Sequence, residues 1–213
     1  MRKKPVIPVA VTLLLVSMSQ SVVVSRAAFA DDSFDEYQCE YTFDLSEMNA
    51  CAVNAYVAAD EQLKNVFKNL RSQLSVEKKA QLEEAQRFWR KFCEAYCDFA
   101  AYPVFDEPGY PFHKHDCLGR VTKQHIKNLE GYNVRGASTA SGADDERLDE
   151  SYQEVINQLY SQVEKLWLKN AQEEWQKFRE AYCGLTADKN GCLERVTRQH
   201  IENLERYIED LDV

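Results

Sequence analysis

The chain has 213 residues, 11% of them aromatic, and a formal net charge of −9 at pH 7. Residues 1–30 contain four basic side chains and no acidic one, so the rest of the chain carries a formal charge of −13. A surface this acidic makes nucleic acid and anionic lipid poor partners. It suits a basic protein partner, although acidity also serves simply to keep a secreted protein in solution.

The N-terminus has the pattern of a secretory signal peptide. Basic residues at 2–4 precede an apolar stretch at 9–16, and the sequence Ala-Phe-Ala at 28–30 matches a small-x-small cleavage site. Polar residues from Ser17 onward interrupt the apolar stretch too early for a membrane span of about 20 residues. We therefore expect residues 1–30 to be removed and the chain to be periplasmic or secreted, with no membrane insertion after cleavage.

The next segment, residues 39–132, has the periodicity of three helices. Asp44 or Ser46 can cap the first helix, and further helices are expected at about 75–97 and 116–132. Apolar residues recur on one face of the first helix, at Leu63, Val66, Phe67, Leu70 and Leu74.

A small, polar stretch at residues 133–144 indicates a linker. Beyond it, residues 145–211 repeat the helical scheme in shorter form, and Ser161 with Glu164 has the spacing of a capping box. The sequence therefore predicts an all-α fold, in which two tandem three-helix units follow a cleaved signal peptide and a disulfide stabilises each unit.

The two units share a pair of motifs. W-R-K-F-C-E-A-Y-C at 89–97 returns as W-Q-K-F-R-E-A-Y-C at 175–183, with seven of nine positions identical. C-L-G-R-V-T-K-Q-H-I-K-N-L-E at 117–130 returns as C-L-E-R-V-T-R-Q-H-I-E-N-L-E at 192–205, with eleven of fourteen identical. This identity indicates an internal duplication, and the aromatic stripe in the first motif is expected to be core.

All seven cysteines follow the predicted signal peptide, which indicates a disulfide framework. The second unit has only two of them, so the simplest pairing is Cys183–Cys192 and, by the duplication, Cys97–Cys117. Cys39 and Cys51 have no counterparts in the second unit, and their joint absence suggests a third pair. Cys93 is then left over, and the connectivity of these last three stays open at this point.

Four motifs of the first unit form a known pattern: D-L-S-E-M-N-A-C at 44–51, D-E-Q-L-K-N-V-F at 60–67, A-Q-x-x-W-x-x-F at 85–92 with a cysteine five residues later, and C-L-x(3)-T at 117–122. Together they resemble the LprI-type lysozyme inhibitor domain. The resemblance covers residues 39–132 in full and 145–207 in degenerate form. It implies a small secreted helical domain of bacterial envelopes, tied by disulfides, and for a named member it implies inhibition of lysozyme.

The histidines do not indicate catalysis. His125 and His200 occupy equivalent sites, where the family has Arg, and we expect each to pack in the core with a hydrogen bond to the neighbouring helix. No serine or cysteine nucleophile has a recognisable setting beside them. The cysteine and histidine spacing does not match a zinc site, and His113 with His115 alone makes a weak ligand pair. We therefore expect a non-enzymatic protein with no cofactor and no metal.

One stretch departs from the duplication. The second and third helices are joined by nineteen residues, 98–116, in the first unit and by eight, 184–191, in the second. The longer connection contains three prolines together with aromatic and acidic residues: Phe99, Tyr102, Phe105, Asp106, Glu107, Tyr110 and Phe112. Aromatic side chains on a stiff, closed loop lose little entropy on binding, so we expect these seven residues to bind a partner. The alternative is that the loop folds back and its aromatic residues cover the helical core.

These features predict a secreted, periplasmic, non-enzymatic binding protein similar to lysozyme inhibitors. A basic protein partner such as lysozyme would associate rapidly with the acidic chain. The alternative is a structural or assembly adaptor of the bacterial envelope whose partner is another periplasmic protein.

Overall fold

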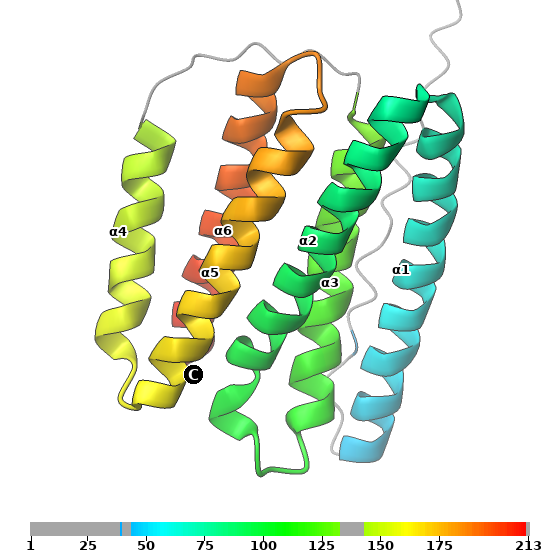
Figure 1. Cartoon of the computed structure of the whole chain (residues 1–213). Coiled ribbons are helices and arrows are strands. Elements are labelled where there is room, and N and C mark those ends of the chain that lie inside the picture. The colour runs from blue at the N-terminus through cyan, green and yellow to red at the C-terminus, as the bar shows by residue number, and fades with distance from the viewer. Residues whose placement is uncertain (1–38, 40–43, 133–142, 212–213) are drawn as a thin grey trace, which may run out of the picture. The chain divides into compact units, whose positions relative to one another are not determined.

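The helices lie where the apolar periodicity predicts them. The computed structural model describes Cys39 and residues 44–132 and 143–211, and these form α-helices and one short 3-10 helix, without a strand (Figure 1). The first copy of the repeat contains α1 (Leu45–Gln73), α2 (Val76–Ala100), η1 (Tyr102–Val104) and α3 (Tyr110–Glu130). The second contains α4 (Ala143–Gln158), α5 (Gln162–Cys183) and α6 (Lys189–Leu211). The all-α prediction is confirmed.

The predicted signal peptide and residues 133–142 of the predicted linker lie outside the described residues. None of the described helices combines the length and the apolar character that crossing a membrane requires.

The starts of α1, α2 and α5 follow from their capping residues. The Asp44 carboxylate accepts the backbone N–H of Ser46 at 2.8 Å, and the Ser75 hydroxyl caps α2 in the same way. Ser161 and Glu164 bond reciprocally at the start of α5, which confirms the predicted capping box. Each cap satisfies backbone donors that would otherwise be orphaned and stabilises its helix by about 1 kcal/mol.

Two helix boundaries differ from the sequence prediction. α3 begins at Tyr110 rather than near Asp116, and α4 begins at Ala143, inside the predicted linker. Pro111 lies in the first turn of α3, where its missing N–H costs no hydrogen bond, so it starts the helix rather than breaking it. The first turn of α4 is acidic, which suits the positive end of a helix dipole.

Three disulfides are present: Cys39–Cys51, Cys97–Cys117 and Cys183–Cys192, with Cα–Cα distances of 5.8, 5.5 and 5.4 Å. The last two join the end of the second helix of each copy to its third helix, as the duplication predicts. Cys93 is free and buried. No bridge among the described cysteines joins one copy to the other.

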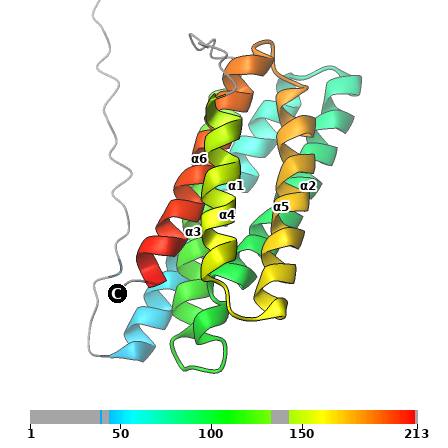
Figure 2. The ribbon, with the colours of Figure 1, turned by 90° about the vertical axis from the view of Figure 1, so that its left-hand side faces the viewer.

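The two copies share one hydrophobic core. α2 packs along α5, while α1 packs on α3 and α4 packs on α6 (Figures 1 and 2). Most of the buried residues of both copies belong to a single cluster whose largest members include Tyr96, Trp175 and Tyr182. Residues Cys39–Val213 accordingly form one compact unit in which neither copy has a separate main core.

Candidate binding surface

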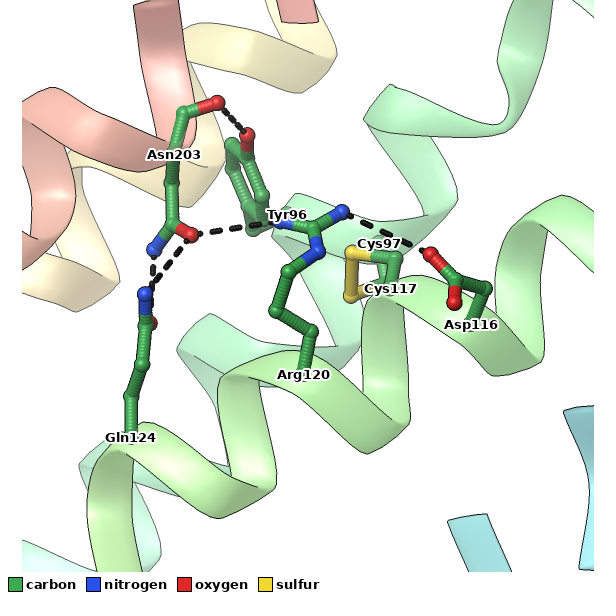
Figure 3. A network of polar contacts seen from close by, with 7 residues as sticks. All are labelled: Tyr96, Cys97, Asp116, Cys117, Arg120, Gln124 and Asn203. Carbon is green, nitrogen blue, oxygen red and sulfur yellow. Dashed lines mark hydrogen bonds and ion pairs between the residues drawn. A yellow bond between two sulfur atoms is a disulfide. The ribbon is translucent and has the colours of Figure 1, made fainter. Parts of the chain in front are cut away.

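Three polar residues of α3 that recur unchanged in α6 lie at the contact between the copies. Arg120, Gln124 and Asn128 are spaced by four residues along α3, which places them on one helical face. Asn203 Oδ1, on α6, accepts hydrogen bonds from Arg120 at 3.3 Å and from Gln124 at 3.1 Å, and its Nδ2 donates back to Gln124 at 3.0 Å (Figure 3). The Tyr96 hydroxyl donates to the Asn203 backbone carbonyl at 2.5 Å.

The same contacts recur with the roles of the copies exchanged. Asn128 Oδ1 accepts from Arg195 at 3.2 Å, and Asn128 Nδ2 donates to Gln199 at 2.7 Å. The Tyr182 hydroxyl donates to the Asn128 carbonyl, as Tyr96 does to Asn203. Such reciprocal pairing is the mark of a twofold relation, here between two halves of one chain.

Both tyrosine hydroxyls in this network are protonated donors at neutral pH. Burial raises the pKa of Tyr96 to about 12, and it raises the pKa of Tyr182 further. Removing one partner would leave a buried polar group unpaired, which costs about 1–3 kcal/mol. The network therefore fixes how the two copies meet.

The repeated histidines also lie at this contact. His125 stacks on Trp89 of its own copy with ring centroids 4.3 Å apart, and it meets Phe178 of the other copy edge-on at 5.3 Å. His200 makes the equivalent contacts with Trp175 at 4.4 Å and with Phe92 at 5.3 Å.

Each histidine is bonded to the preceding helix of its own copy, as the sequence predicts. His125 Nε2 donates to Gln86 at 2.8 Å and His200 Nε2 donates to Gln172 at 2.7 Å. Burial, aided by a nearby arginine, lowers the pKa of each imidazole to about 3. The cavity between the copies that they line measures about 20 Å³, enough for roughly one water molecule. Both histidines are neutral packing residues.

Cys93 occupies the site where the second copy has Arg179. Burial raises the pKa of its thiol to about 12, so the nucleophilic thiolate is not populated at neutral pH. Arg179 instead lies over the Trp175 ring at 4.8 Å and donates to Thr197 and Asp145. Among the residues that the structure describes, no three His, Cys, Asp or Glu side chains could hold a metal ion together.

Two of the seven predicted binding residues are in the interior. Phe99 is fully buried in the last turn of α2, with its ring 4.5 Å from that of Tyr207. Phe112 is buried in α3 against Met48 and Ala52, in a small cluster of its own. These two aromatic residues cover the core, as the alternative interpretation of the loop states.

The other five lie at or near the surface, on a shorter connection than the sequence suggests. Phe105 is 51% exposed, Asp106 and Glu107 are exposed, and Tyr102 and Tyr110 are partly exposed. The Phe105 ring lies between the tyrosines, 6.1 Å from that of Tyr102 and 5.3 Å from that of Tyr110.

Two contacts hold the connection between α2 and α3 in place. Lys114 Nζ lies 2.5 Å from Asp98 Oδ1, which ties the first turns of α3 to the end of α2 beside the Cys97–Cys117 bridge. Tyr102 packs edge-on against Trp167 of α5, with centroids 5.0 Å apart. Trp167 is a contact that the sequence analysis missed.

A protein-family model described as "Lysozyme inhibitor LprI" matches residues 39–129 and 134–204. The chain belongs to the LprI lysozyme inhibitor family. The two matched segments correspond to the two copies, so the resemblance stated from the sequence is confirmed, tandem arrangement included. No curated protein matches the chain.

A solved structure shares the LprI chain's fold. The crystal structure of an uncharacterized protein from Burkholderia thailandensis superposes with a TM-score of 0.63 at 17% sequence identity, over 81% of this chain and 93% of that one. At this identity the likeness concerns the fold alone.

Proposed function

We propose that the chain is an extracytoplasmic, non-enzymatic binding protein that inhibits lysozyme. The observation that carries this proposal is that both copies match the model of a lysozyme inhibitor family. Three disulfides suit an oxidising compartment outside the cytoplasm, in keeping with the predicted signal peptide at residues 1–30. The proposed limits of the repeated units are residues 39–132 and 145–211.

The proposed contact residues are those that the connection exposes. Phe105 and Tyr102 offer aromatic side chains, which supply much of the energy of protein interfaces when they enter a pocket of the partner. Asp106 and Glu107 follow Phe105 directly and are exposed, so they are placed to meet basic side chains. Tyr110 supports Phe105 from behind and is expected to contribute less.

The charge of the chain favours a basic partner. The sequence carries 35 acidic against 26 basic side chains. Opposite net charges raise the association rate and make it sensitive to salt. A basic lysozyme of the common type meets this requirement.

A turnover assay tests the proposal. Adding the purified chain, from residue 31 onward, to a lysozyme assay on cell-wall substrate should inhibit at micromolar concentration. The inhibition should weaken as salt is raised, because screening slows the association. Absence of inhibition against several lysozyme types would remove this function and favour the envelope-adaptor role.

A further inference from the structure

Because the two copies are related by a twofold, the two ends of the α2–α5 helix pair can be compared. At one end the α2–α3 connection meets the first turns of α5, through Tyr102 and Trp167. At the other end the start of α2 meets the α5–α6 connection, where Lys78 and Tyr132 both donate to the Leu185 carbonyl, at 3.3 and 3.0 Å. At each end, therefore, the first turns of the second helix of one copy meet the connection between the second and third helices of the other copy.

The two ends differ in sequence where their backbones correspond. Aligning Trp89 with Trp175 pairs Val163, Leu166 and Trp167 of α5 with Glu77, Ala80 and Gln81 of α2. The first copy folds with small or polar residues at these sites, so the helical scaffold does not require large apolar ones. Their presence in the second copy calls for another explanation.

The apolar side chains at this end are exposed. Tyr160, in the α4–α5 turn, is 99% exposed, Leu166 is 64% exposed and Val163 is 46% exposed. Trp167 continues this surface to Tyr102 and Phe105 of the first copy. We call these six residues the aromatic end: Tyr102, Phe105, Tyr160, Val163, Leu166 and Trp167. A gathering of exposed apolar side chains is typical of an interaction site.

Acidic residues accompany the aromatic end. Asp106 and Glu107 follow Phe105, and Glu209 and Asp210 close α6 at the same end, because Tyr207 of α6 packs on Phe99 beside the connection. The basic group of Lys114 at this end is paired with Asp98. An apolar patch flanked by acidic side chains suits a partner whose binding site combines apolar pockets with basic side chains.

We infer that the aromatic end, built jointly by the two copies, is the surface that docks a basic protein. The inference rests on the lysozyme-binding function proposed above and adds that α5 and the α4–α5 turn contribute to it directly. Neither copy has the whole surface alone, since the first has Glu77, Ala80 and Gln81 in place of Val163, Leu166 and Trp167, and the second lacks the long connection. The duplication thus supplies two different parts of one binding site.

Calorimetric titration of the chain with egg-white lysozyme as the probe tests the inference. The variant combining Tyr160→Ser with Leu166→Gln removes exposed apolar groups of the second copy. Val76→Ser is the matched control, because Val76 is 85% exposed in the first turn of α2, at the opposite end. The double variant should bind at least about tenfold more weakly, as expected for interface side chains, while the control should bind like the parent. Both should keep the parent's melting temperature.

The outcomes separate the inference from the proposed function. If the parent binds and the double variant binds equally well, the inference about the aromatic end is overturned, whereas the proposed lysozyme binding stands. If the parent does not bind at all, the proposed function fails and the inference fails with it. If sedimentation shows a dimer of the chain that the double variant dissociates, a second copy occupies the surface and the basic-partner inference is overturned.

Discussion

Each buried histidine lies between an indole of its own copy and a phenyl ring of the other copy. Among the described residues its Nδ1 has no hydrogen-bond partner, whereas its Nε2 donates to a glutamine. A neutral imidazole fits this setting, whereas a charged one would be desolvated close to an arginine, Arg90 for His125 and Arg179 for His200. The protonation of two residues is therefore coupled to the packing of the whole core.

Lowering the pH from 7.5 to 5.5 should destabilise the protein. The folded pKa of His125 and His200 is about 3, below the value of about 6.5 in an unfolded chain. Between these values the unfolded state binds more protons, so stability is lost as the pH falls through 6.5 towards 3. The expected loss at pH 5.5 is about 1.4 kcal/mol for each histidine, measured by urea unfolding. His200→Gln should remove about half of the pH dependence, and an unchanged unfolding free energy in the parent would contradict this account.

At the scale of elements, the segment joining α2 to α3 serves two purposes. Its ends extend the helices and bury Phe99 and Phe112, while its middle exposes Phe105 and the acidic pair that follows it. The shorter α5–α6 connection places Leu185 where the first copy has Phe99, and Leu185 is buried too. The buried positions belong to the scaffold, and the exposed ones are special to the first copy.

Replacing residues 98–116 with residues 184–191 should therefore reduce stability. The exchange removes buried Phe112, substitutes leucine for Phe99 and deletes the ion pair between Asp98 and Lys114. Losing a buried phenylalanine costs about 3 kcal/mol or more, so the melting temperature should fall by several degrees. The control Phe105→Ser should change stability by only about 0.5 kcal/mol, because the side chain is half exposed. If the exchanged protein has the same melting temperature as the parent, the buried rings contribute little to stability.

The sequence predicted those features that depend on local pattern. Helix periodicity, caps, the two repeated disulfides and the packed histidines all follow from residue spacing and from the duplication. The start of α3 was missed because Pro111 has two opposite meanings, chain breaker or first-turn residue, and only the surrounding fold selects one. The contact of Trp167 was not predicted, since nothing in its helix indicates that a connection from the other copy packs on it.

The sequence contains an indication of the polar contact between the copies. Arg120, Gln124 and Asn128 recur in the second copy at identical spacing on one helix face. A face that met only solvent would not need the same polar residues in both copies. Polar identity on one face indicates a polar contact, but it does not name the partner helix. Only the structure shows that each set bonds to the other copy.

At the scale of the whole molecule, the twofold relation organises the described residues and one end breaks it. The core, the polar network and the histidine sandwiches are symmetric, as expected when a duplicated unit pairs with itself. The long connection and its contact with Trp167 of α5 occur at a single end. A symmetric scaffold would offer two equivalent sites, whereas we propose one site for this chain.

The stoichiometry of lysozyme binding tests this account most directly. Titration calorimetry of the chain with a basic common-type lysozyme should give one lysozyme per chain, because the proposed aromatic end occurs once among the described residues. Binding should weaken as salt rises, in line with the formal charge of −13 carried by residues 31–213. Two lysozymes per chain would show that each copy binds separately, and an absence of binding heat together with an absence of inhibition would contradict the function itself.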